Sequence, residues 1–137
     1  MTGLAGELFV AAELLKRELQ TSVTFGSAKS VDLLAYNPRT KIVYPVQVKT
    51  LRSANYFLLA ANKVEKHLIY VFVLLNKPGQ MVRYFVVPGE DLAANPERFS
   101  KAFMATKMPG ILPSTLMKLG YENAWDIFDG NSADCRN

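Results

Sequence analysis

The sequence predicts a single α/β domain in which helices flank a mixed β-sheet. The first observation is length, because 137 residues make one ordinary domain with a core of its own. The second is composition, since 50% hydrophobic and 20% charged residues are typical of a folded chain. The third is the order of patterns along the chain, which indicates a helix, three strands, an ambiguous segment, two strands and short helices.

The first helix is expected over Thr2 to about Gln20, with Thr2 as its N-cap. Apolar residues recur there at intervals of three and four, which is the period of one helix face. The members of this predicted stripe are Leu4, Leu8, Ala11, Ala12, Leu15 and Leu19.

Three strands are expected next, at Thr21 to Phe25, Val31 to Tyr36 and Ile42 to Thr50. The last two are joined by a turn, residues 37–40, which contains a proline. Pro45 lacks a backbone N–H, so the third strand is expected to lie at a sheet edge there or to carry a bulge.

The second half of the chain opens on residues 53–67, which fit either a strand or the start of a helix. The run from His67 to Leu75 is almost wholly apolar and is expected to be the central strand. It is expected to form a hairpin with a strand at Val82 to Val87. Further helices are expected at Pro96 to about Ala105, capped by Asn95, and around Ser114 to Leu119 and Glu122 to Phe128.

Several functional classes are disfavoured by composition. The longest apolar run is too short to cross a membrane, and Glu7 and Glu13 interrupt the region that a signal peptide would need, so a cytoplasmic protein is expected. A single cysteine, Cys135, allows no intrachain disulfide or cysteine cluster, and a single histidine, His67, excludes a His-rich zinc site. The net charge of +4 weakly favours a polyanionic partner.

Three polar residues interrupt the apolar strands: Asp32, Gln47 and Lys49. A hairpin turn centred between Arg39 and Thr40 pairs residues whose numbers sum to 79, which sets Asp32 opposite Gln47. Gln47 and Lys49 have the same parity and so project from the same sheet face. The three side chains are therefore expected to converge at one end of the hairpin, and Glu7 of the first helix is a fourth candidate.

This set of side chains suits hydrolysis of a phosphodiester bond with a divalent metal. Carboxylate and amide oxygens are ligands that Mg²⁺ accepts, so Asp32 and Gln47 are candidate ligands, with Glu7 as a further ligand or a water-mediated helper. Lys49 is the candidate catalytic lysine, which would position or deprotonate the attacking water. Each residue also has an ordinary structural explanation. Asp32 fits a residue that bonds a turn, and Glu7 fits an exposed helix acid. Gln47 and Lys49 fit the solvent face of an edge strand.

The first 50 residues resemble the PD-(D/E)XK nuclease superfamily, in particular its small Holliday-junction-resolvase-like members. The resemblance is carried by Gly6-Glu7, by residues 31–36 (VDLLAY) and by residues 46–50 (VQVKT). In that superfamily a helix carries an acid, a metal-binding aspartate opens a hairpin, and a (D/E)-x-K triplet lies on the next strand. The resemblance implies a restriction-endonuclease-like core over residues 1–130, followed by a polar tail, residues 131–137.

Two positions depart from the superfamily pattern. Val31 replaces the proline before the aspartate, and Gln47 replaces the acid of the triplet. Glutamine variants occur among active members, but a neutral ligand weakens a metal site unless Glu7 compensates.

The expected function is therefore a DNA endonuclease that uses Mg²⁺ or Mn²⁺, and the resemblance implies a homodimer. The alternative is a non-catalytic nuclease fold, such as an immunity or antitoxin-like protein or an accessory subunit, that binds a protein or nucleic acid.

Three basic residues and one tryptophan are further candidates for contact with nucleic acid. Lys29, Arg52 and Lys63 flank the constellation and are candidates for phosphate contacts, although each also fits an ordinary solvated charge. Trp125 has apolar neighbours at helical spacing, so it is expected in the core and not as a base-stacking residue.

Overall fold

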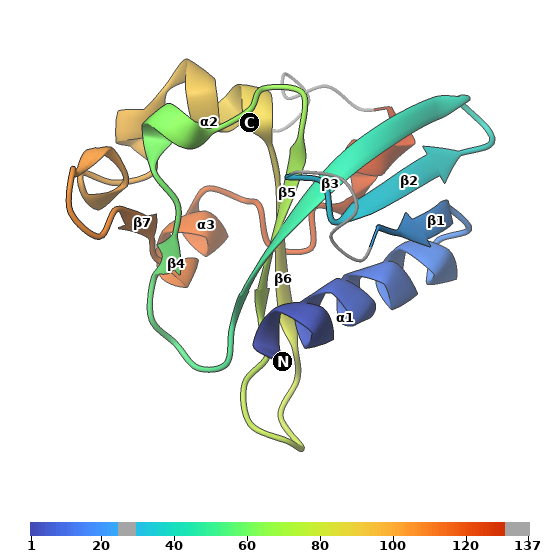
Figure 1. Cartoon of the computed structure of the whole chain (residues 1–137), viewed down its shortest axis with the longest axis horizontal. Helices are drawn as coiled ribbons and strands as arrows, with labels where there is room; N and C mark the ends of the chain where they lie inside the picture. The colour runs from blue at the N-terminus through green and yellow to red at the C-terminus, as the bar shows by residue number, and fades with distance from the viewer. Residues whose placement is uncertain (25–29, 131–137) are drawn as a thin grey trace.

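The structure is a computed structural model that describes residues 1–24 and 30–130. Over these residues the chain forms a five-stranded mixed sheet of order β1-β2-β3-β5-β6 and a small two-stranded sheet of β4 and β7 (Figure 1). The expected mixed-sheet α/β domain is confirmed. The strands are β1 Gln20–Val23, β2 Leu33–Asn37, β3 Ile42–Leu51, β4 Phe57–Leu58, β5 Ile69–Leu74, β6 Arg83–Pro88 and β7 Gly110–Ile111.

Three α-helices and four short 3₁₀ helices pack around the sheet in the described part of the chain. The α-helices are α1 Thr2–Lys16, α2 Gly89–Ala94 and α3 Pro113–Lys118. The 3₁₀ helices are η1 Ala61–Lys63, η2 Pro96–Arg98, η3 Ala102–Met104 and η4 Trp125–Asp129.

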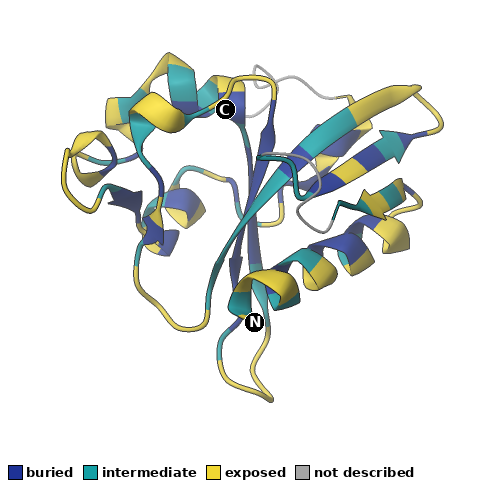
Figure 2. Ribbon diagram, viewed as in Figure 1, coloured by how far each residue is buried: buried dark blue, intermediate teal, exposed yellow. Residues whose placement is uncertain are grey.

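The described residues bury two apolar clusters, one on each face of the large sheet. One face packs against α1 and η4, and its cluster includes Val10, Leu33 and Trp125. The other face is covered only over β5 and β6, by α2, α3, β4, β7 and the 3₁₀ helices η2 and η3. None of the described elements covers the outer part of this face, over β1, β2 and the start of β3, and Figure 2 shows exposed positions there.

The register is as the sequence predicts, and β5 is an inner strand, although β3 holds the middle position of the five. β5 lies between β3 and β6, parallel to the first and antiparallel to the second, and all six of its residues are buried. Leu33 pairs with Val46, which gives the predicted sum of 79 for the β2–β3 hairpin. Pro45 lies just before the pairing with β5 begins, where β3 has only β2 as its partner, so the missing N–H costs no ladder bond to β5.

Two expectations about the first helix are wrong. Thr2 is its first helical residue and Met1 is the N-cap, and the helix ends at Lys16. It ends there because Glu18 adopts a left-handed φ of 65°, while Leu19 N–H donates to the carbonyl of Leu14 at 3.1 Å and closes the last turn.

The predicted apolar stripe of that helix is also largely wrong. Of the predicted stripe Ala11 and Leu19 are buried, but the other four residues are exposed: Leu4, Leu8, Ala12 and Leu15. The helix also buries Gly6, Val10 and Leu14. The helix carries apolar residues on two sides, so periodicity alone does not determine which side is buried. Close approach of Gly6 to the sheet selects the buried side.

The helix expected over Pro96 to Ala105 is absent from the structure. Two 3₁₀ turns, η2 and η3, replace it, and the preceding α2 was not expected. Ser100 explains the break, since its Oγ accepts the Phe103 N–H at 3.0 Å and donates to the Gly110 carbonyl at 3.1 Å. Near the C-terminus α3 matches the helix expected at Ser114 to Leu119, whereas the last expected helix is the 3₁₀ helix η4.

Candidate active site

Asp32 lies just before β2, at the point where the β2–β3 ladder ends. Its carboxylate Oδ2 accepts the Val48 N–H at 2.8 Å, and its own N–H donates to the Val46 carbonyl at 2.8 Å. The carboxylate therefore accepts a β3 backbone N–H that a neighbouring strand would otherwise bond. These two bonds join Asp32 to the residues on either side of Gln47, whereas the ladder itself ends at the pair Leu33 and Val46.

Gln47 and Lys49 project from the sheet face opposite α1. In the parallel ladder with β5 they pair with Tyr70 and Phe72, whose side chains belong to the cluster on that face. Both residues line a hollow of about 800 Å³, which we call the β3 hollow. Its other walls come from Ser30 and from segments 58–65 and 103–109. Within the described part of the chain Lys49 forms no ion pair, so no carboxylate neutralises its ammonium.

Glu7 approaches the same strand from the opposite face. A Cβ built on Gly6 would lie 1.9 Å from Thr50 Oγ1, so only glycine lets α1 come this close to β3. Burial raises the pKa of the Glu7 carboxyl, and the negative charge of Asp32 raises it further. Glu7 and Asp32 are therefore close enough for their charges to interact. Gln47 and Lys49, by contrast, line one hollow together.

The donor set fits a divalent metal ion. Among the described residues the Asp32 carboxylate accepts one hydrogen bond, at Oδ2, which leaves Oδ1 as an oxygen ligand. Burial is the main reason that the pKa of Glu7 is raised, and a bound cation would relieve the smaller part that comes from the charge of Asp32. No three His, Cys, Asp or Glu side chains gather anywhere in the described ranges, so a metal here would depend on two carboxylates and the Gln47 amide.

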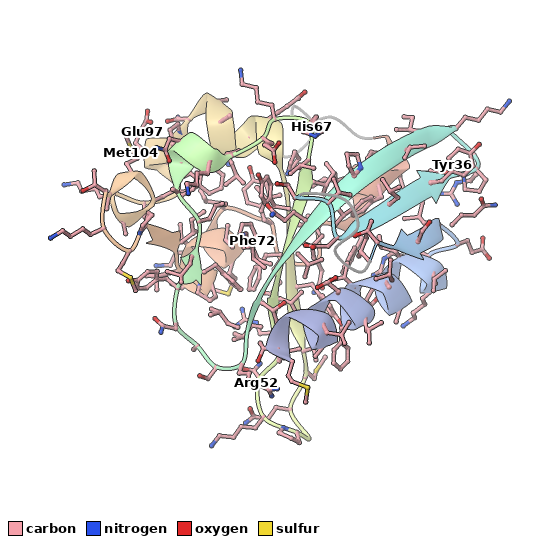
Figure 3. All side chains as sticks on the ribbon, viewed as in Figure 1. Tyr36, Arg52, His67, Phe72, Glu97 and Met104 are labelled. Atoms are coloured by element: carbon pink, nitrogen blue, oxygen red, sulfur yellow. The ribbon has the colours of Figure 1, made fainter. Side chains whose placement is uncertain are left out.

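The three residues singled out for phosphate contacts have different surroundings. Lys63 of η1 lines the β3 hollow together with Lys49. Arg52 lies just beyond β3 and its Nε donates to Thr2 Oγ1 at 2.8 Å, which ties the end of the strand to the start of α1 (Figure 3). Lys29 lies outside the described residues.

Sequence reasoning missed the far wall of the β3 hollow. Leu58, Met104 and Met108 stand on it with 54 to 66% of their surface exposed. The only signal was two methionines in a polar segment, which carries no periodicity.

His67 is exposed, and Trp125 packs in the core as expected, beneath the guanidinium of Arg17 at 4.7 Å.

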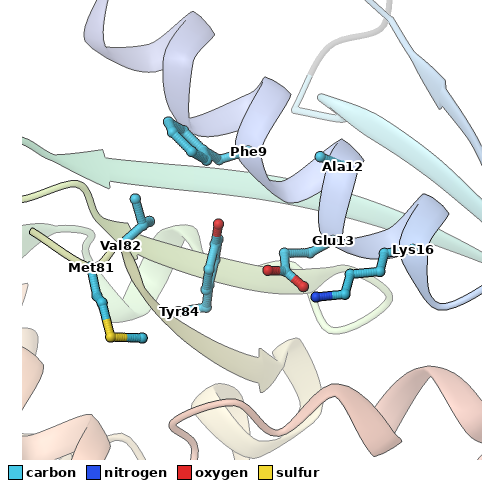
Figure 4. A pocket seen from close by; sticks show the side chains of 7 residues that line it. All are labelled: Phe9, Ala12, Glu13, Lys16, Met81, Val82 and Tyr84. Carbon is cyan, nitrogen blue, oxygen red and sulfur yellow. The ribbon is translucent and has the colours of Figure 1, made fainter. Parts of the chain in front are cut away.

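A second hollow, of about 320 Å³, lies between α1 and the start of β6 (Figure 4). Its walls include Phe9, Glu13 and Tyr84 but none of the four candidate site residues. Burial, with the charge of Glu13, raises the pKa of the Tyr84 phenol to about 12. Tyr84 is thus neutral at physiological pH.

Sequence comparison finds no match among known protein families or curated proteins. Among solved structures, the chain is similar to a bacterial homing endonuclease, I-Ssp6803I, with a TM-score of 0.61. The similarity covers 98% of this chain and 94% of that one, at 17% sequence identity. The two chains share a fold. No helix among the described residues is long and apolar enough to cross a membrane.

Proposed function

We propose that this chain is a metal-dependent DNA endonuclease of the PD-(D/E)XK type. The observation that carries the proposal is Asp32, held by the Val48 N–H at the edge of β3, between Glu7 on one sheet face and Gln47 and Lys49 on the other. The fold shared with a homing endonuclease supports the proposal.

Each side chain has a role in this proposal. Asp32 Oδ1, the Gln47 amide oxygen and the Glu7 carboxylate would hold Mg²⁺ or Mn²⁺. The metal, when bound, lowers the pKa of a coordinated water and offsets charge on the phosphate. Lys49, whose ammonium has no ion-pair partner among the described residues, orients the scissile phosphate and the attacking water. Lys63 and Arg52 would contact flanking phosphates.

Cleavage tests the proposal directly. Supercoiled plasmid, branched junctions, single-stranded DNA and RNA are incubated with Mg²⁺ or Mn²⁺. Lys49→Ala is expected to lower the cleavage rate by about 10² to 10⁴. Lys118→Ala, at the end of α3, removes an exposed lysine outside the hollow and should cleave like the wild type. Equal rates for Lys49→Ala and wild type would overturn the assignment.

Metal binding gives an independent readout. Isothermal titration with Mn²⁺ should show a saturable site that Asp32→Asn weakens and Glu90→Gln leaves unchanged, since Glu90 is an exposed acid on α2. Equal Mn²⁺ affinity in wild type and Asp32→Asn would remove Asp32 from the ligand set.

Gln47 favours a second candidate, a nuclease fold that binds without cutting. A neutral amide leaves two carboxylates for the metal, and the described residues contain no group of three His, Cys, Asp or Glu side chains that could hold a metal ion. Salt-sensitive DNA binding without metal-dependent cleavage would support this candidate. Tight association with one protein and no DNA affinity would support an immunity-like role. The expected homodimer stays a prediction, which sedimentation of the full chain would test.

A further inference from the structure

The β3 hollow extends well beyond the residues that the proposed chemistry uses. Gln47 and Lys49 form one side of it, and the opposite side belongs to segments 58–65 and 103–109. Its volume of about 800 Å³ lies within the range of pockets that enclose a small organic group. A scissile phosphate at Lys49 would therefore have an empty, walled space beside it.

The chemistry of that wall matches a nucleobase. Leu58, Met104 and Met108 present apolar surface to the hollow, with exposures of 55, 54 and 66%. Methionine thioethers pack well against aromatic rings. Asn62 supplies an amide with both donors and an acceptor, which is what the edge of a base requires, and Lys63 supplies a cation for its phosphate.

The shape of the site distinguishes paired from unpaired DNA. A base inside a duplex is stacked on its neighbours, so it reaches a walled hollow only if it leaves the stack. An unpaired nucleotide has already lost that stacking and enters at lower cost. A hollow of about 800 Å³ beside the reacting phosphate therefore favours a substrate with an unpaired nucleotide.

We infer that the β3 hollow binds one unpaired nucleotide adjoining the cut, so that the substrate class is DNA with a bulge, flap or single-stranded branch. This inference rests on the proposed function for the position of the phosphate. The binding step itself needs no cleavage and is measured separately.

The binding experiment uses duplexes with a 2-aminopurine nucleotide either unpaired as a bulge or paired, in Ca²⁺ to prevent cutting. The fluorescence of the bulged base is expected to change on binding, and Leu58→Gln should weaken affinity for the bulged duplex by about tenfold. Leu15→Gln is the matched control, because Leu15 is also 55% exposed but lies on α1 outside the hollow. Met104→Gln is a second hollow variant, in case Leu58→Gln does not fold.

The outcomes separate the two proposals. Equal affinity of both hollow variants and Leu15→Gln for the bulged duplex overturns the inference, even if Lys49→Ala abolishes cutting. A loss of affinity that is the same for bulged and paired duplexes also overturns it. Weaker binding of the bulged duplex alone, in a protein that cuts no substrate, supports the hollow and overturns the endonuclease.

Discussion

β5 and β2 belong to the same sheet but have opposite surroundings. Every residue of β5 is buried. In β2 buried positions alternate with more exposed ones, and the more exposed ones lie on the face away from α1. β3 joins the two regions, since it pairs with β2 at its start and with β5 at its end. Polar side chains on β3 therefore lie where the sheet passes from an open face to a covered one. This boundary is the place where reactive groups keep access to substrate while their backbone stays rigid.

The largest expected effect compares two leucines on the same sheet face. Leu74 of β5 is 2% exposed and Leu34 of β2 is 39% exposed. Leu74→Ala should lower the free energy of unfolding by about 2 to 5 kcal/mol, because it leaves a cavity in the covered half. Leu34→Ala should change it by about 0.5 kcal/mol or less. Urea unfolding measures both, and similar losses would mean that the outer half of the sheet is also covered.

The next effect concerns how the open half is tied to the core. Asn37 is fully buried at the end of β2, where its Nδ2 donates to the Phe128 carbonyl at 2.8 Å and its Oδ1 accepts the Arg39 N–H at 2.9 Å. Asn37→Ala should lower the free energy of unfolding by about 1 to 3 kcal/mol, since it leaves buried backbone groups unpaired. Asn55→Ala, at an exposed loop position, is the control. A loss confined to Asn55→Ala would contradict this reading of the turn.

A smaller effect distinguishes the two glycines at the start of α1. Gly6→Ala drives a methyl group into Thr50, and overpacking of this kind costs about 1 to 3 kcal/mol, offset by about 1 kcal/mol of helix propensity. Gly3→Ala meets no atom closer than 4.0 Å and should stabilise the protein. Thermal unfolding compares the two variants.

Thr50→Ala provides the rescue for that comparison. Thr50 Oγ1 is buried without a hydrogen-bond partner among the described residues. When Thr50→Ala is added to Gly6→Ala, no hydrogen bond is therefore lost, and space is made for the added methyl group. If the double variant is as unstable as Gly6→Ala, the contact with Thr50 is not the cause.

The sequence predicts the hairpin register because the register depends on local rules. A proline turn and strict alternation set the sum of 79 in the β2–β3 pairing, and parity alone places Gln47 and Lys49 on one face. The extent of the apolar run predicts that β5 is a buried inner strand, and β5 lies between β3 and β6.

Long-range contacts account for what the sequence does not predict. The buried face of α1 depends on the fit of Gly6 against Thr50, which lies 44 positions away (50 minus 6). The 3₁₀ turns that replace the helix near Phe99 depend on the bond from Ser100 to Gly110. The wall of the β3 hollow comes from two segments without periodicity, so no local pattern could indicate it.

The smallest effect compares two glutamates whose pKa values are displaced in opposite directions. Burial and the charge of Asp32 raise the pKa of Glu7, whereas the hydrogen bonds from Arg83 lower the pKa of Glu122. The folded protein therefore holds a proton on Glu7 more tightly than the unfolded chain does. The stability that this provides is complete below the ordinary value of 4.5 and is lost as pH rises through the raised pKa. The stability that Glu122 contributes depends on pH in the opposite direction. It is present above pH 4.5 and is lost as the pH falls through the lowered pKa of Glu122.

Urea unfolding between pH 3 and pH 7 measures both signs. Glu7→Gln should be slightly more stable than wild type at neutral pH, with the difference vanishing in acid, and Glu122→Gln should be less stable at neutral pH, with its difference also shrinking in acid. Mn²⁺ should then stabilise the wild type more than Glu7→Gln, because a cation bound between Glu7 and Asp32 removes the repulsion that the substitution also removes. Equal stabilisation of both proteins by Mn²⁺ would place the metal away from Glu7 and would leave the raised pKa as a consequence of burial alone.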